Sequence, residues 1–143
     1  MKVTAGWDKG QFSEAEIKTF IADIEAFWGN VSYKIGELTY KLSVGIELGA
    51  GYTPGSKYNE GGDINFLPCL KCTGSGNDAK ADRGGSNIYV LSNKTPGVIA
   101  HEFGHVLGLG HRLNSTGSIQ SYSANNWKVT QDDLLKVFSG YAN

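Results

Sequence analysis

With 143 residues, 40% of them hydrophobic, the chain is long enough to bury one core and too short for two ordinary domains. Its 13 basic and 14 acidic residues nearly cancel, which argues against nucleic acid or an anionic membrane as a partner. No apolar run approaches the ~18 residues that span a bilayer. We therefore expect a single domain over residues 1–143, acting as a monomer.

The first predicted element is an amphipathic helix over residues 12–29. Ser13 and Glu16 have the spacing of a capping box, and Phe12 and Ile17 occupy the positions of a hydrophobic staple. Apolar residues then recur every three or four positions until a Gly-Asn pair ends the helix. The pattern predicts a scaffold helix with one buried side.

Strands and loops follow the helix. Residues 31–35 and 42–48 alternate apolar with polar or small residues, which predicts two strands of a sheet packed on the helix. Residues 49–62 are rich in glycine and predict a loop, residues 63–67 a short strand, and residues 68–85 a second long loop. Such loops in a small domain often shape a substrate site.

The second loop contains a C-x-x-C pair, Cys69 and Cys72. The sequence has no second such pair, so a zinc ribbon is excluded, and a local disulfide, two free thiols, or a metal or redox role stay open. The acidic residues Asp63, Asp78 and Asp82 could suggest calcium, but their spacing fits no calcium loop. We prefer solvated loop charge and leave calcium unsupported.

Residues 86–92 predict the last strand before a second helix. Thr95 is placed to cap that helix and Pro96 to take its first position. The helix is predicted to end at Gly108, because glycine adopts the left-handed conformation that closes a helix without strain.

The second helix contains the motif H-E-x-x-H-x-x-G-x-x-H, over residues 101–111. A spacing of four places His101 and His105 on one helix face. His111 can join them only if the chain turns back after Gly108, since a continued helix would carry it about 15 Å away. The motif therefore predicts three imidazoles around one ion.

Three neutral imidazoles and one water form the open site typical of catalytic zinc. Zinc lowers the pKa of such a water from about 15.7 towards about 7. Glu102, next to the first ligand, is the candidate general base. The alternative is a helix whose histidines are surface or core residues, but all three histidines of the chain fall at ligand positions.

At these residues the sequence resembles the metzincin clan of zinc metallopeptidases. The resemblance implies an α+β fold with an N-terminal helix on a small mixed sheet, a zinc-binding helix, a Met-turn-like loop and a C-terminal helix. It also implies one Zn²⁺ and a protein or peptide substrate bound in an extended conformation.

In metzincins the strand before the zinc helix lies at the sheet edge and pairs with substrate. The resemblance therefore implies that backbone groups of this strand bind substrate by strand addition. The residues concerned are Ser86, Asn87, Ile88, Tyr89 and Val90. An ordinary inner strand is the alternative.

Residues 118–122 read S-I-Q-S-Y, where the clan has a tight turn of the form S-x-M-x-Y. Gln120 replaces the methionine that forms an apolar floor under the histidines, and its amide must find partners or the site loses about 1 to 3 kcal/mol. By the same resemblance, Tyr122 can approach zinc and stabilise the oxyanion. Alternatively, Tyr122 only packs under the zinc helix.

The chain closes with another predicted helix. Thr130 and Asp133 form its capping pair, and Val129 and Leu134 its staple. A terminal helix after the turn is also what the resemblance implies.

The leading hypothesis is a zinc-dependent endopeptidase with Glu102 as general base. The alternatives are a catalytically weakened zinc-binding module, suggested by Gln120, and a metalloamidase acting on non-protein amides. The given chain carries no signal peptide or inhibitory propeptide. By analogy we expect either the C-terminal toxin module of a large bacterial delivery protein or a free, secreted enzyme trimmed of those segments.

Overall fold

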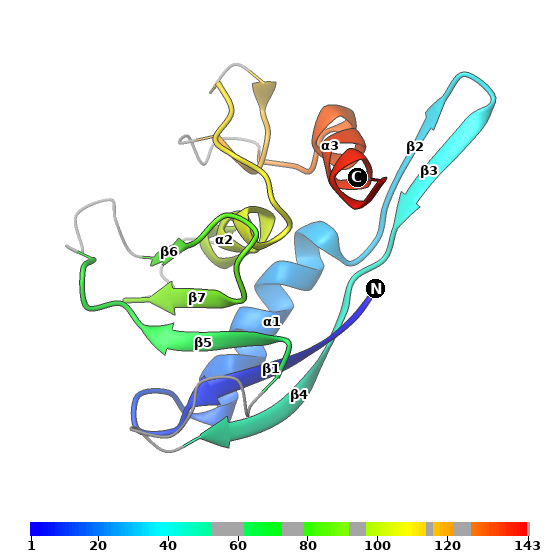
Figure 1. Cartoon of the computed structure of the whole chain (residues 1–143). Helices are drawn as coiled ribbons and strands as arrows, with labels where there is room; N and C mark the ends of the chain where they lie inside the picture. The colour runs from blue at the N-terminus through cyan, green and yellow to red at the C-terminus, as the bar shows by residue number, and fades with distance from the viewer. Residues whose placement is uncertain (53–61, 73–78, 92–96, 114–115, 122–126, 143) are drawn as a thin grey trace.

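The computed structural model of the protein describes residues 1–52, 62–72, 79–91, 97–113, 116–121 and 127–142. Its helices and strands (Figure 1) are β1 Lys2–Asp8, α1 Glu14–Trp28, β2 Val31–Ile35, β3 Leu38–Leu42, β4 Gly45–Tyr52, β5 Ile64–Pro68, β6 Ala79–Ala81, β7 Asn87–Val90, α2 Val98–Val106 and α3 Gln131–Ala142. Within the described residues, no helix is long and apolar enough to cross a membrane.

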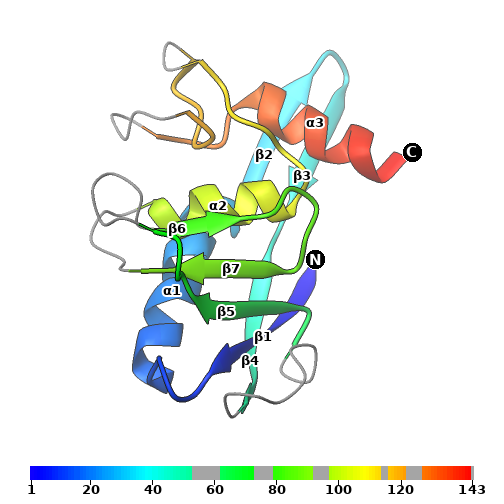
Figure 2. The same cartoon turned by 60° about the vertical axis from the view of Figure 1, so that its left-hand side comes forward.

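A five-stranded mixed sheet forms the body of the molecule, in the order β4-β1-β5-β7-β6. The first four strands run parallel, and β6 pairs antiparallel with β7. Figure 2 shows these strands stacked below α2, with α3 on the far side of that helix. The predicted α+β architecture, with a helix on a small mixed sheet and a C-terminal helix, is confirmed.

Strand β1 lies inside the sheet, between β4 and β5, although the sequence analysis proposed no strand before residue 12. Its pattern is present in the sequence, since Val3, Ala5 and Trp7 are buried at every second position. Lysine, alanine, glycine and aspartate are weak strand formers, however, and they make up four of the seven residues of K-V-T-A-G-W-D.

The predicted strand 42–48 is wrong in its boundaries. It combines the last residue of β3 with the start of β4, which continues to Tyr52 and so takes residues from the predicted loop. The mistake has a physical cause: Leu42, Val44 and Ile46 are all buried, so the alternation of period two continues across the break between the two strands.

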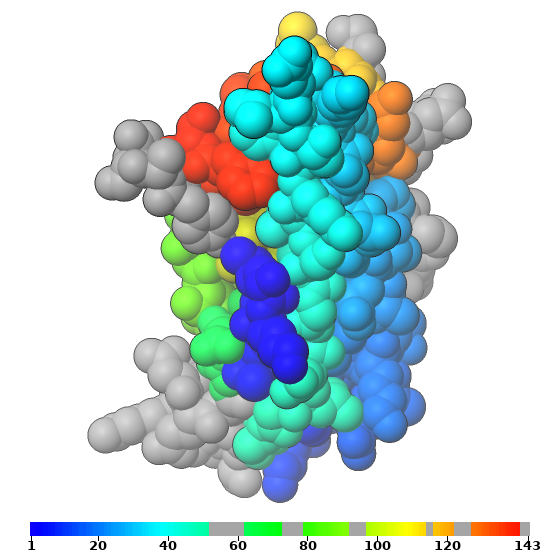
Figure 3. Space-filling view, turned by 90° about the vertical axis from the view of Figure 1, so that its right-hand side faces the viewer, coloured from blue at the N-terminus to red at the C-terminus, as the bar shows by residue number. Residues whose placement is uncertain are grey.

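Strands β2 and β3 form a separate antiparallel hairpin that packs on α3. The Tyr33 hydroxyl donates to the Val129 carbonyl at 2.6 Å, and the rings of Tyr40 and Phe138 lie 5.7 Å apart between centroids. In Figure 3 the hairpin, in cyan, lies against α3, in red. The hairpin therefore supports the C-terminal helix.

Helix α1 covers one face of the sheet with a buried stripe of Ile17, Phe20, Ile21, Ile24 and Trp28. Phe27, also predicted for this stripe, is only partly buried. The predicted capping box is confirmed. The Glu16 amide donates to Ser13 Oγ at 3.1 Å, and the Ser13 amide donates to Glu16 Oε1 at 3.0 Å. At the other end of the helix, Trp28 Nε1 donates to the Ala100 carbonyl at 3.0 Å and so joins α1 to α2.

The N-terminus of α2 is capped by α1. Thr95 and Pro96, predicted to start this helix, lie outside the described residues, and the helix begins at Val98 with Gly97 in a left-handed conformation at the N-cap. The Asp23 carboxylate of α1 accepts three amide hydrogen bonds at 2.7 to 3.1 Å, from Gly97, Ile99 and Ala100. A carboxylate there complements the helix dipole.

The predicted edge position of residues 86–90 is wrong. Strand β7 is an inner strand, paired with β5 on one side and β6 on the other. The residues predicted to pair with substrate are thus already paired: Ser86 accepts a bond from the Asn65 amide, and Asn87, Ile88, Tyr89 and Val90 form β7. The edge strand on this side of the sheet is β6, which consists of three residues within the predicted loop 68–85.

Of the three alternatives for the C-x-x-C pair, the structure has the disulfide between Cys69 and Cys72. The bridge follows directly after β5. It closes a short turn at the end of that strand and therefore leaves no free cysteine among the described residues.

Candidate metal centre

Helix α2 brings two of the three histidines together. His101 and His105 are both buried, with ring centroids 4.8 Å apart and the two Nε2 atoms 3.2 Å apart. The spacing of one helical turn produces this arrangement, as the sequence predicts.

The third histidine reaches the same place because the helix ends. Gly108 has a φ of 97°, a conformation that favours glycine, and the Leu109 amide donates to the Gly104 carbonyl at 3.0 Å to close the turn. The His111 ring then lies 5.3 Å from the His101 ring and 4.7 Å from the His105 ring. The ligand atoms of the three residues all lie within 4.8 Å of one another.

Backbone carbonyls fix the orientation of the two buried rings. His101 Nδ1 lies 2.6 Å from the Ile119 carbonyl, and His105 Nδ1 lies 2.7 Å from the Leu109 carbonyl. A carbonyl only accepts, so each Nδ1 carries the proton and each Nε2 presents its lone pair to the common centre. This is the tautomer that metal-binding histidines need.

The histidine geometry fits a zinc ion. Two lone pairs facing each other at 3.2 Å repel unless a cation lies between them. Tetrahedral zinc with bonds of about 2.0 to 2.1 Å separates two nitrogen ligands by roughly 3.3 Å. The observed separation therefore matches two ligands of one zinc ion, with His111 as the third.

Burial favours the neutral form of His101 and His111. The pKa of His101 is lowered to about 4, mainly by burial and also by the nearby His105 and His111, against the opposing effect of the hydrogen bond to Ile119. Burial, together with His105, also lowers the pKa of His111. Only neutral imidazole binds a metal, so these shifts favour binding at neutral pH.

Glu102 is buried between α2 and the edge strand. Its pKa is raised to about 7, because burial outweighs the lowering effects of the Ala81 backbone and of the positive charge of Lys80. Both residues belong to β6. Sequence reasoning missed Ala81 and Lys80, because a run of three residues between loops carries no strand pattern.

Gln120 occupies the floor of the site, fully buried. A Cβ at residue 104 would lie 2.0 Å from Gln120 Oε1, so Gly104 leaves the space that the amide fills. Gln120 Nε2 lies 3.4 Å from His105 Nδ1. Because that Nδ1 proton already bonds the Leu109 carbonyl, the contact brings two N–H groups together and adds no hydrogen bond. Among the described residues, Oε1 has no partner either.

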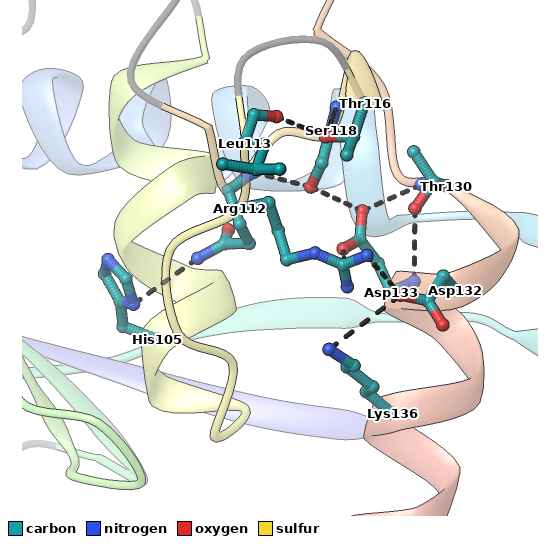
Figure 4. Close-up of polar contacts among 10 residues, drawn as sticks. His105, Arg112, Leu113, Thr116, Ser118, Thr130, Asp132, Asp133 and Lys136 are labelled. Carbon is teal, nitrogen blue, oxygen red and sulfur yellow. Dashed lines mark hydrogen bonds and ion pairs between the residues drawn. The ribbon is translucent and has the colours of Figure 1, made fainter.

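The turn under the site is tied to α3. The backbone N–H of Gln120 donates to Ser118 Oγ at 3.0 Å. Ser118 Oγ in turn donates to Asp133 Oδ2 at 2.7 Å (Figure 4). The predicted capping pair of α3 is confirmed: the Thr130 amide donates to Asp133 Oδ2 at 2.9 Å, and the Asp133 amide to Thr130 Oγ1 at 3.1 Å. Asp133 therefore both caps α3 and holds the turn.

One aromatic residue was predicted at the metal centre, and a second one lies beside it. Tyr122, the predicted oxyanion residue, lies outside the described residues, so its role stays a prediction. Trp127, which sequence reasoning did not single out, stacks on His101 with centroids 5.6 Å apart and donates from Nε1 to Ser121 Oγ at 3.0 Å. No sequence signal separates this tryptophan from an ordinary core aromatic.

Comparison with known proteins agrees with this geometry. A family model described as Matrixin, a peptidase family, matches residues 5–142, which includes the sheet, the metal centre and α3. No curated protein matches the chain. Matrixins are zinc enzymes, and the three clustered histidines fit that cofactor. The chain therefore belongs to the matrixin family and forms a zinc-metallopeptidase domain.

Proposed function

We propose that this protein is a zinc-dependent endopeptidase that hydrolyses peptide bonds in extended protein or peptide substrates, with Glu102 as general base. The observation that carries the proposal is the position of Glu102. It directly follows the ligand His101 and is buried, on the helix that packs against the edge strand β6, where the Ala81 backbone lowers its pKa. The base thus lies between the metal ligands and the strand that an extended substrate would join.

His101, His105 and His111 would hold the zinc ion, and zinc, when bound, supplies Lewis acidity and lowers the pKa of water. Glu102 is suited to move the proton. With a pKa near 7, its carboxylate can take a proton at neutral pH and give it to the leaving amine. The Ala81 amide orients the carboxylate for this transfer.

The free edge of β6 is the natural place for substrate. Among the described residues, β6 pairs only with β7, so its other side presents backbone groups that an extended peptide can bind. The substrate-binding role predicted for residues 86–90 is therefore proposed here for Ala79, Lys80 and Ala81.

The test is the variant Glu102→Gln, which keeps the shape of the side chain but cannot accept the proton. On a denatured protein with zinc present, we expect cleavage to fall about 10²- to 10⁴-fold while zinc still binds one to one. Glu25→Gln, on the exposed side of α1, is the matched control and should cleave normally. Undiminished cleavage by Glu102→Gln, or cleavage that survives phenanthroline, would contradict the proposal.

A catalytically weakened zinc-binding module is the second candidate. It is favoured by Gln120, whose buried Oε1 has no partner among the described residues. Zinc-loaded protein that leaves denatured protein and peptide libraries intact would support it over the endopeptidase.

A further inference from the structure

The residue after the third histidine is anchored to the C-terminal helix. The guanidinium of Arg112 contacts Asp132 through Nη2, and its Nη1 lies 3.6 Å from Asp133 Oδ1. Figure 4 shows the guanidinium directed at the first turn of α3, where both acids lie. The Arg112 side chain is only 18% exposed and that of Asp133 is fully buried.

Arg112 is also joined to the turn under the metal centre. Its backbone amide donates to the Gln120 carbonyl at 3.0 Å, and Asp133, its ion-pair partner, accepts the Ser118 hydroxyl. The segment that carries His111 and the turn that carries Gln120 are therefore fixed to each other and to α3.

Asp133 depends on this arginine. A buried carboxylate is costly without an opposite charge, and among the described residues Arg112 is the only cation within ion-pair distance of Asp133. Among the described residues, the ion-pair partner of Lys136 is Asp132, at 3.8 Å, and both side chains of that pair are about half exposed. The planar guanidinium can face two carboxylates at once, which an ammonium group does poorly.

The segment that carries His111 is held in place differently from the other two ligands. His101 and His105 belong to α2, whereas His111 follows Gly108 on an exposed segment without helical structure, next to Arg112. We propose that Arg112 is a positioning residue of the metal centre, which holds the His111 segment in place through Asp132 and Asp133. The inference rests on the proposed zinc site. None of its readouts depends on the proposed peptidase activity.

The test compares Arg112→Gln and Arg112→Lys with Lys136→Gln, a control that removes the other cation paired with Asp132 and leaves Arg112 in place. Zinc affinity is measured by competition with a chromophoric chelator, and ligand geometry by the visible absorption of the Co²⁺-substituted protein. Arg112→Gln should weaken zinc binding about 10- to 100-fold, the range for residues that orient metal ligands, and shift the cobalt bands. Arg112→Lys should fall between it and wild type, and Lys136→Gln should match wild type within twofold.

Wild-type zinc affinity and cobalt bands in Arg112→Gln would overturn the inference. Should Arg112→Gln fail to fold, Arg112→Lys decides, because it keeps a cation near Asp133: weakened zinc binding supports the inference, and wild-type binding makes Arg112 a purely structural residue. A failure of the proposed function would give a different result. If the wild-type protein binds zinc but cleaves no substrate, the peptidase proposal is wrong, and the affinity and cobalt comparisons still decide the role of Arg112.

Discussion

Replacing Gln120 with methionine tests how the floor of the metal centre is built. Gln120 is fully buried, and its Oε1 has no hydrogen-bond partner among the described residues. Methionine has nearly the same length, fills the same space and brings no polar atom that needs a partner. The substitution therefore removes a desolvated amide without opening a cavity.

The expected gain follows from the missing partner. A buried polar group left without a hydrogen bond costs about 1 to 3 kcal/mol, and the contact of Nε2 with His105, at 3.4 Å, pairs two donors and offsets little of this cost. We expect Gln120→Met to raise the free energy of unfolding of the zinc-free protein by about 1 to 3 kcal/mol. For a domain of this size, that corresponds to a rise in Tm of roughly 3 to 10 °C.

Urea unfolding and calorimetry of the zinc-free protein measure the change directly. Gln11→Met, at an exposed position in the turn before α1, is the control for the amide-to-thioether change itself and should move the free energy by less than about 0.5 kcal/mol. A Gln120→Met protein that is less stable than wild type would show that the amide has a stabilising partner, and the reasoning about this floor would be wrong.

Three further predictions concern the same centre. Gly104→Ala should destabilise the protein by about 1 to 3 kcal/mol in urea unfolding, because the new Cβ would lie 2.0 Å from Gln120 Oε1, and the double variant with Gln120→Ala should recover part of the loss. Folding of the zinc-free protein lowers the pKa of His101 from 6.5 to about 4, so the stability that depends on its neutral form is lost as the pH falls through that range. Folding raises the pKa of Glu102 from 4.5 to about 7, so the stability that depends on its protonated form is lost as the pH rises through that range. The two slopes oppose each other between pH 4.5 and 6.5, so Glu102→Gln should lose stability on acidification more steeply than wild type, by up to about 1.4 kcal/mol per pH unit; equal slopes in the two proteins would contradict the assignment. Tyr122→Phe should lower kcat more than it raises KM if the hydroxyl stabilises the oxyanion, and unchanged kcat would leave Tyr122 a packing residue.

The metal ligands could be predicted because they depend on local rules. A spacing of four on a helix and a glycine that ends it determine where His101, His105 and His111 lie, and both rules act within eleven residues. The capping pairs Ser13 with Glu16 and Thr130 with Asp133 are similarly local, and the structure contains both. Such features do not require knowledge of the sheet.

The missed features depend on contacts that no single segment carries in its own sequence. β1 contains weak strand formers and β6 is only three residues long, and they become strands because neighbouring strands pair with them. The cap of α2 comes from Asp23, more than seventy residues earlier, so a local search for a capping residue could only find Thr95. Arg112 is likewise an ordinary charged residue until α3 brings Asp132 and Asp133 beside it.

X-ray absorption at the zinc edge, on protein loaded with one equivalent of zinc, tests the central claim most directly. Convergence of the three imidazoles predicts one tightly bound zinc per chain, with three nitrogen ligands and one light-atom ligand at about 2.0 to 2.1 Å, and His111→Ala should reduce the imidazole count to two. Zinc that does not bind, or a spectrum with fewer than three imidazoles in the wild type, would contradict the account.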